Sequence, residues 1–183
     1  MDQKDEKTEQ TDTSACAKSA AKPVGDIALR WKWVERSVWT DRMLAALEQG
    51  VKGGKWYSLI DKVWRESNLL SAWLAVAAND GAAGVDRQSV AAFRARRESE
   101  LGRLSEEIGL GRYKRQAARR VWIDKPGSTE KRPLGIPCVR DRVAEGAIRQ
   151  VIEPIFEREF AEHSYGFRPG RSAQQAVGRV EPL

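Results

Sequence analysis

Two prolines interrupt the chain at residues 131–142, which read KRPLGIPCVRDR. Pro133 and Pro137 lack a backbone N–H and hold the residue before them in extended geometry, so this stretch cannot continue a helix. A short β-prone run, Val121 to Ile123, comes before it, and a turn of Pro, Gly, Ser and Thr separates the two. The pattern predicts an antiparallel β-hairpin with a cationic loop.

The net charge of the chain is concentrated around this hairpin. Residues 112–132 hold eight basic and two acidic side chains, a local charge of +6 that equals the charge of the whole chain. A solvated helix face usually mixes both signs, so an unmixed basic segment favours a polyanionic partner. The basic residues are Arg112, Lys114, Arg115, Arg119, Arg120, Lys125, Lys131 and Arg132.

Two of these cations have a special position in the hairpin. Lys125 follows the first predicted strand and Arg132 opens the second, so both can point into one space. Arginine offers a planar fork and lysine a compact charge, and together they suit a triphosphate. The alternative is an edge strand that positive charge protects from aggregation. Spacing alone leaves these two interpretations evenly matched.

Helical periodicity accounts for much of the segment before the hairpin. The spacing predicts a helix that ends at Gly50, a helix that begins with a capping box of Ser58 and Asp61, and a helix stopped by the turn NDGAAG at 79–84. The tryptophans in residues 27–39 are expected in the core.

Helices are also predicted on both sides of the hairpin. One runs from Val90 to Gly109 or Gly111 and should weaken at Gly102. Another follows Asp141, and Pro154 should kink or divide it.

Asp141 lies between Arg140 and Arg142 at a helix start. A capping or salt-bridge role for its carboxylate is the better explanation there, with both arginines structural.

The loop SYGFRPGRS at 164–172 interleaves aromatic and basic side chains. Its aromatics, Tyr165 and Phe167, are expected to fill the core, whereas Arg168 and Arg171 are candidates for phosphate contacts. Ser172 and Gln175 could form the capping box of a last helix.

Other residue types carry no site. Cys16 and Cys138 are expected to be reduced thiols, and neither lies near His163 in a metal-ligand spacing. Residues 1–25 are too poor in large apolar side chains to fold and are expected to be a disordered tail. The tail has no signal-peptide pattern and the chain no membrane span, which favours a soluble, cytoplasmic protein.

Three stretches resemble the N-terminal part of bacterial group II intron reverse transcriptases and maturases. They are residues 38–64, NDGAAGVD at 79–86, and residues 112–177. The most specific elements are RPLGIP, the RDR that follows it, and SYGFRPGRS. The resemblance covers nearly everything after the tail.

The resemblance implies part of a right-hand polymerase. The expected fold is α+β and mostly helical, with the fingers of a reverse transcriptase, a small antiparallel β-hairpin and an incomplete palm. The expected divisions are a tail at 1–25, a helical N-terminal extension at 26–78, and fingers with a truncated start of the palm at 79–183.

The resemblance also suggests roles for the cations. The family's hairpin lysine and the arginine that opens RPLGIP contact the incoming nucleotide, and they match Lys125 and Arg132. Template or intron RNA is expected to contact Arg112, Lys114, Arg115, Arg119, Arg120, Lys131, Arg168 and Arg171. Two departures are Asp124, where a proline is usual, and Glu145, where a glutamine is common.

The expected function is that of the N-terminal fragment of an intron-encoded RNA-directed DNA polymerase, a nucleotidyltransferase and maturase. Its partners would be group II intron RNA and an RNA template with a DNA primer, and the intact protein would use Mg²⁺ and be compatible with a homodimer. No catalytic residue and no metal ligand is expected here, because the family's metal-binding aspartates would lie beyond Leu183. The fragment alone should therefore be inactive.

Two alternatives stay open. The chain could be a non-catalytic RNA-binding module that uses the basic hairpin. It could instead be a truncated or frameshifted gene product that does not fold stably, since GRVEPL at its end departs from the family pattern and apolar faces would stay exposed.

Overall fold

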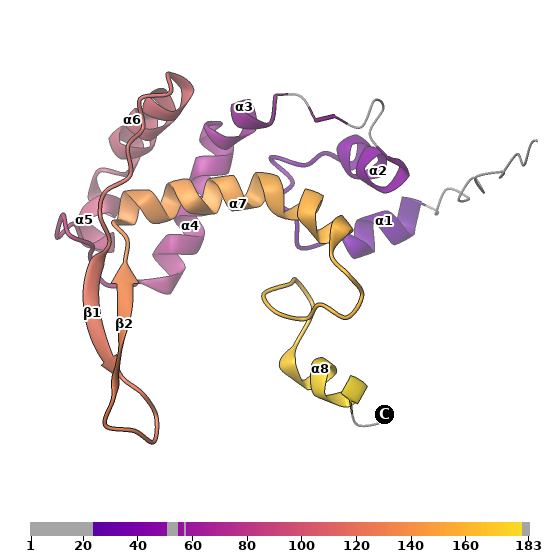
Figure 1. Ribbon diagram of the computed structural model, residues 1–183. Coiled ribbons are helices and arrows are strands. Elements are labelled where there is room, and N and C mark those ends of the chain that lie inside the picture. Colours follow the sequence, from indigo (N-terminus) through magenta and orange to yellow (C-terminus); the bar gives the residue numbers. More distant parts are fainter. Residues whose placement is uncertain (1–23, 51–54, 57, 181–183) are drawn as a thin grey trace, which may run out of the picture.

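The computed structural model describes residues 24–50, 55–56 and 58–180. The predicted tail at 1–25 lies outside this part except for its last two residues, which open the first helix. The elements within it are α1 (Val24–Arg30), α2 (Asp41–Gln49), α3 (Leu59–Val63), α4 (Glu66–Asn79), α5 (Val90–Ala95), α6 (Arg97–Gly109), β1 (Arg119–Asp124), β2 (Lys131–Ile136), α7 (Val139–Glu159) and α8 (Ala173–Val180) (Figure 1). The described part is mainly helical with one small sheet, as the sequence predicts.

Helix α7 is the central element, and its apolar face packs against α4. Val143, Ala147 and Val151 repeat at i and i+4, so they share one buried face. The two helices approach closely at Gly146, where an added Cβ would lie 3.3 Å from the Cβ of Ala72. Of the kink or division predicted at Pro154, the division does not occur, because α7 continues through this buried residue to Glu159. Packing along that face stabilises the helix despite the missing N–H.

The N-terminal segment is tied to α7 by tryptophans. Trp31 and Trp39 are fully buried, which confirms their prediction as core residues. The indole N–H of Trp39 donates to the carbonyl of Gln150 on α7 at 3.1 Å. A buried indole N–H needs such an acceptor, so this bond fixes α7 against the segment between α1 and α2.

Asn68 provides a polar link inside the same core. Its buried side-chain amide donates to the carbonyls of Lys62, Val63 and Ala147. One side chain therefore joins the end of α3, the start of α4 and the middle of α7. Carbonyls left free at a helix end need partners, and this asparagine supplies the donors.

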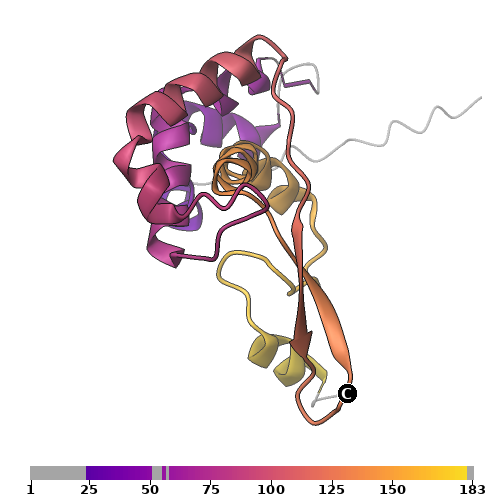
Figure 2. The same ribbon diagram turned by 90° about the vertical axis from the view of Figure 1, so that its left-hand side faces the viewer.

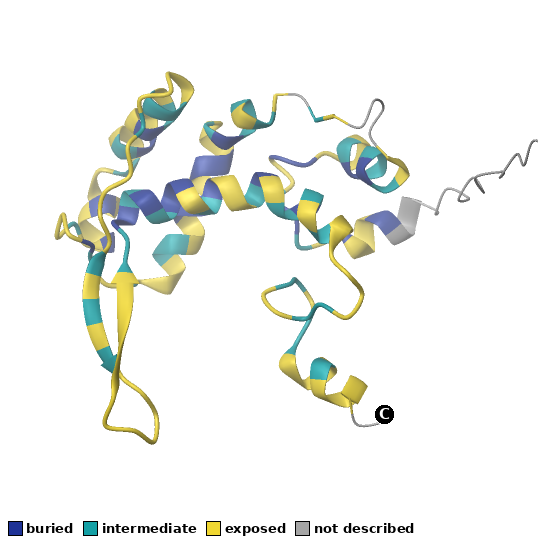
Figure 3. Cartoon of the chain, viewed as in Figure 1, coloured by how far each residue is buried: buried dark blue, intermediate teal, exposed yellow. Residues whose placement is uncertain are grey.

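Strands β1 and β2 form the predicted antiparallel hairpin, with Arg119 opposite Ile136 and Asp124 opposite Lys131. The strands pack on each other rather than on any helix face, and the hairpin extends away from the helices (Figure 2). Figure 3 shows its outer end exposed, while the helical core is buried. The hairpin is thus an arm whose position depends on its base.

Two predicted helix features are wrong in detail. Ser58 has a left-handed backbone, with φ of 55°, and its side chain caps nothing, so the capping box with Asp61 does not form. The helix that starts at Val90 breaks at Arg96 and not at Gly102. The break lets Phe93 stack on Trp73, with ring centroids 4.7 Å apart, while α6 continues through Gly102.

Candidate nucleic-acid and nucleotide interface

The hairpin register determines which cations share a face. The N–H of Lys125 donates to the carbonyl of Glu130, which continues the pairing of Asp124 with Lys131. Side chains alternate between faces along a strand, so Lys125 and Arg132 lie on the same face as diagonal neighbours. Ile123, directly opposite Arg132, shares that face. Lys125 and Arg132 are therefore close enough for both side chains to reach one phosphate ligand.

The two cations differ in their partners. The ammonium of Lys125 is 2.6 Å from a carboxylate oxygen of Glu130, and both side chains are largely exposed. Such an exposed pair contributes at most about 1 kcal/mol, so an anionic ligand can displace Glu130. Arg132 is exposed, and its guanidinium has no partner among the described residues. The arginine is therefore free to bind, and the lysine can be released.

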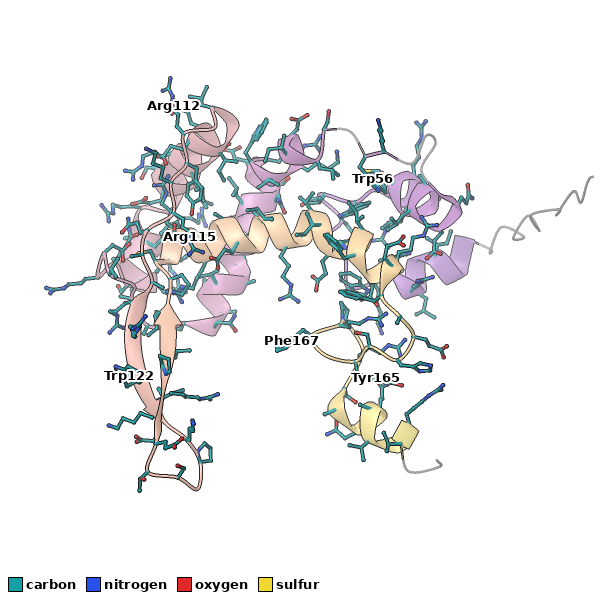
Figure 4. All side chains as sticks on the ribbon, viewed as in Figure 1. Trp56, Arg112, Arg115, Trp122, Tyr165 and Phe167 are labelled. Carbon is teal, nitrogen blue, oxygen red and sulfur yellow. The ribbon has the colours of Figure 1, made fainter. Side chains whose placement is uncertain are left out.

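The opposite face of the hairpin carries Arg120, Trp122 and Lys131. Lys131 is 3.7 Å from Asp124, and the indole of Trp122 is half exposed beside Pro133 across the ladder (Figure 4). The two faces thus hold different pairs of cations.

Three consecutive residues in the first turn of α7 hold the base of the hairpin. They are Arg140, Asp141 and Arg142. Asp141 is 2% exposed, and its carboxylate accepts from the hydroxyl of Tyr113 at 2.5 Å and from the N–H of Gln116 at 3.1 Å. The expected capping or salt-bridge role of Asp141 is therefore wrong. Its partners lie instead in the segment that leads into β1, because burial makes a carboxylate recruit several donors.

The arginines on either side of Asp141 bind two further segments. Arg140 pairs with Glu107 on α6, and Arg142 donates to the carbonyl of Ala82 at 2.8 Å. Three consecutive residues thereby join α6, the segment before β1 and the loop after α4. The structural roles predicted for both arginines are confirmed.

Tyr113 acts as a neutral donor at this junction. Burial and the hydrogen bond to Asp141 raise the pKa of its hydroxyl far above the usual range for tyrosine. Burial likewise raises the pKa of the Cys138 thiol, which donates to the side-chain carbonyl of Gln116 at 3.5 Å. Both groups therefore keep their protons near neutral pH. Tyr113 and Gln116 were not predicted from the sequence, because nothing local marks residues that contact a side chain 25 to 28 positions later.

The remaining predicted RNA contacts fall into two places. Arg112, Lys114 and Arg115 are exposed on the segment before β1, where Figure 4 labels two of them. Arg115 lies 3.9 Å from Glu145. Arg119 is less exposed, and its guanidinium donates to the carbonyl of Ala83 at 2.9 Å. Arg119 therefore also anchors the hairpin to the loop after α4.

Arg168 and Arg171 lie apart from the hairpin, in the loop between α7 and α8 (Figure 1). The side chain of Arg168 is 7% exposed, pairs with Glu157 at 2.6 Å and donates to the carbonyls of Ala161 and Ser164. The pairing with Glu157 raises its pKa further. This conformation offers a ligand little of Arg168. Arg171 lies over the ring of Tyr165.

The same loop contradicts one prediction. Phe167 was expected in the core, but its side chain is fully exposed, at 103% of the reference area, and points away from the loop (Figure 4). The reason is the bonding of Arg168. Its side chain turns inward to Glu157 and to the carbonyls of Ala161 and Ser164, so the preceding side chain, that of Phe167, is left facing solvent. The predicted capping box of Ser172 and Gln175 is confirmed, with bonds of 3.0 and 3.3 Å.

Across residues 24–50, 55–56 and 58–180, His, Cys, Asp and Glu side chains form no group of three or more that could hold a metal ion. In the same part of the chain, every helix is too short or too polar to cross a membrane.

Comparisons with known proteins reveal relatives. No protein-family model matches the chain. Protein YkfC of Escherichia coli is 43% identical over 98 residues, which cover 54% of this chain and 26% of that protein. The group II intron-encoded protein LtrA of Lactococcus lactis is 36% identical over 84 residues, or 46% of this chain and 14% of LtrA.

A further relative comes from yeast. The COX1/OXI3 intron 1 protein of Saccharomyces cerevisiae is 36% identical over 83 residues, which are 45% of this chain and 10% of that protein. The chain thus spans about a quarter or less of these relatives. Each of these matches covers about half of the chain. The resemblance based on the motifs had been expected to cover nearly everything after the N-terminal tail.

Proposed function

We propose, from the premise that this chain is a relative of group II intron-encoded proteins, that it provides the RNA-binding N-terminal extension and fingers of an intron-encoded RNA-directed DNA polymerase and maturase. The observation that carries the proposal is the hairpin, which places Lys125 and Arg132 on one face of an exposed basic arm. The alternative, in which positive charge only protects an edge strand from aggregation, explains why the hairpin is basic. It does not explain why Lys125 and Arg132 share one face.

The two faces of the hairpin divide the proposed roles. Lys125 and Arg132 bind the triphosphate of an incoming nucleotide after Glu130 releases the lysine. Arg120 and Lys131 on the opposite face, together with the exposed cations before β1, contact template or intron RNA. The proposed partners are group II intron RNA and an RNA template with a DNA primer. A homodimer of the intact protein is part of the same proposal.

Nucleotide binding can be tested with a matched pair of variants. Binding of a fluorescent dNTP is measured for the full 183-residue chain and for Arg132→Ala and Lys131→Ala. A charge-assisted phosphate contact contributes roughly 1.5 to 3 kcal/mol, so Arg132→Ala should weaken binding about 10- to 150-fold. Lys131→Ala removes the neighbouring charge from the other face and should have little effect. Equal losses would show a diffuse electrostatic effect and contradict the proposed site.

RNA binding has its own test. If about four cations neutralise phosphates, log K against log salt should have a slope of roughly −3 on single-stranded RNA. Changing the exposed cations Arg112, Arg115, Arg120 and Lys131 to alanine should flatten that slope. A flat slope for the unchanged chain would exclude both the polymerase proposal and the simpler RNA-binding module.

Polymerase activity separates these two functions. Polymerase chemistry needs carboxylates that hold two divalent metals, and we assign the Mg²⁺ ligands of this family to residues other than those described here. We therefore expect no templated primer extension by the 183-residue chain with Mg²⁺ and a homopolymer template. Incorporation above background would overturn this part of the proposal.

A further inference from the structure

A cavity of about 550 Å³ lies between α7, the loop after α1 and the loop after α7. Its volume is within the range of small-ligand sites in proteins. The cavity is lined by Trp33, Arg149, Glu153, Phe167, Arg168 and Pro169. None of these residues belongs to the hairpin, so the cavity is separate from the proposed nucleotide site.

Phe167 is held at the cavity in an unfavourable conformation. Its φ is 57°, in the left-handed region that bulky residues avoid, and its ring is fully exposed. Both features oppose folding, and such strain persists only where the surrounding structure imposes it. Aromatic rings presented in this way are typical of stacking platforms for bases.

The loop that presents Phe167 is rigidly fixed. The guanidinium of Arg168, the next residue, bonds to Glu157 on α7 and to two loop carbonyls. The capping box of Ser172 and Gln175 holds the other end of the loop. The exposure of Phe167 is therefore a property of an anchored loop.

One guanidinium nitrogen at the cavity is left free for an anionic ligand. Of the two arginines that line the cavity, Arg168 pairs with Glu157 and Arg149 pairs with Glu153. On α7, Arg149 bonds to Glu153 through Nε and Nη2, at 3.0 and 2.7 Å, and its side chain stays 67% exposed. Its other guanidinium nitrogen can still donate to a phosphate.

We infer that this cavity binds an unpaired base of single-stranded RNA. The base contacts the rings of Phe167 and Trp33, and Arg149 donates to the neighbouring phosphate. The inference rests on the proposed RNA-binding function and adds to it a site at the loop between α7 and α8, away from the hairpin. Because every base has a π-face, the site tolerates different sequences.

The test uses the full 183-residue chain and one mixed-sequence 12-nucleotide RNA, single-stranded or annealed to its complement. Phe167→Ala should weaken single-strand binding roughly 5- to 150-fold, the loss expected for one stacked base. Phe167→Tyr keeps the ring and should retain the affinity. Leu29→Ala, which removes another exposed apolar side chain, is the matched control. Duplex affinity should be unchanged by all three substitutions.

The outcomes separate this inference from the function on which it rests. If Phe167→Ala binds like Leu29→Ala while the hairpin variants lose affinity, the cavity inference is wrong and the proposed function stands. An equal loss on the duplex would also overturn the inference. If the unchanged chain binds no RNA, both fail. If Phe167→Ala instead converts a dimer to a monomer in sedimentation, the cavity is an interface between copies and not a base site.

Discussion

Asp141 shows how a single buried carboxylate can organise a larger surface. It accepts hydrogen bonds from Tyr113 and Gln116, which lie in the segment that leads into β1. A two-stranded hairpin is only marginally stable alone, so the position of this basic arm depends on such anchors. The proposed nucleotide site therefore depends on a residue that need not touch the nucleotide.

Asp141→Asn should destabilise the protein by about 1 to 3 kcal/mol. The amide replaces one acceptor oxygen with a donor, so one of the two buried donors loses its partner. Urea unfolding followed by tryptophan fluorescence measures the change. Asp124→Asn is the control, because that side chain is 81% exposed and its substitution should change stability by less than about 0.5 kcal/mol. Equal unfolding midpoints for the two variants would contradict the anchoring role.

Ser71 should make stability depend on pH through Glu35. The Ser71 hydroxyl donates to the Glu35 carboxylate, and this bond is the main reason that the pKa of Glu35 lies below its ordinary value of 4.5. A lowered pKa in the folded state means that the stabilisation is present above pH 4.5 and lost as the pH falls through the folded pKa.

Ser71→Ala should therefore be less stable than the unchanged chain at pH 7, and the difference should shrink as the pH falls below 4.5. Unfolding free energies measured at pH 7 and pH 3 test this. A difference that stays constant with pH would show that Ser71 acts through packing and not through the carboxylate.

At the scale of elements, the loop after α4 and the start of α7 fit together closely. A Cβ at Gly84 would lie 2.6 Å from the Cα and 2.7 Å from the backbone nitrogen of Cys138. Backbone atoms cannot move aside as a flexible side chain can. Gly84 thus permits the contact that Arg142 and Arg119 reinforce through the neighbouring carbonyls.

Gly84→Ala should destabilise the chain by about 1 to 3 kcal/mol, because the methyl group must displace backbone. Gly102→Ala should have the opposite sign and stabilise α6 by up to about 1 kcal/mol, since nothing lies within 4 Å of that position. Melting temperatures of the two variants provide the comparison. Stabilisation by both would show that the loop and α7 are not in close contact.

At the scale of the whole molecule, one core joins the N-terminal segment to α7. Trp31, Trp39 and Trp73 are all buried in it, and the indole of Trp39 bonds directly to α7. Several apolar side chains on the other face of α7 stay exposed, among them Ile148, Ile152 and Phe156. The connected core favours cooperative folding, whereas the exposed stripe was the reason to expect an unstable chain.

Thermal unfolding should decide between these expectations. Because the tryptophans and the central helices share one core, far-UV circular dichroism and tryptophan fluorescence should report a single transition at the same temperature. Two separate transitions would show that the N-terminal segment and α7 fold independently. A gradual loss of signal would support the gene product that does not fold stably.

The sequence by itself determined the local elements of this protein. Pro133 and Pro137 exclude helix, and the β-prone run before them pairs with the extended stretch around Pro133. The capping box of Ser172 and Gln175 begins the last helix. These features depend on backbone restrictions and on contacts within a few residues, so they can be predicted from residues that are close together in the sequence. The cationic pair of Lys125 and Arg132 was predicted for the same reason.

Tertiary structure alone decided which side chains meet across long separations. Asp141 binds Tyr113 and Gln116, and Arg168 turns inward so that Phe167 faces solvent; neither arrangement follows from local spacing. The break at Arg96 arises in the same way, because Phe93 must reach Trp73. In each case burial and hydrogen bonding to distant segments outweigh local preference, since an unpaired buried polar group costs more than a turn of helix contributes.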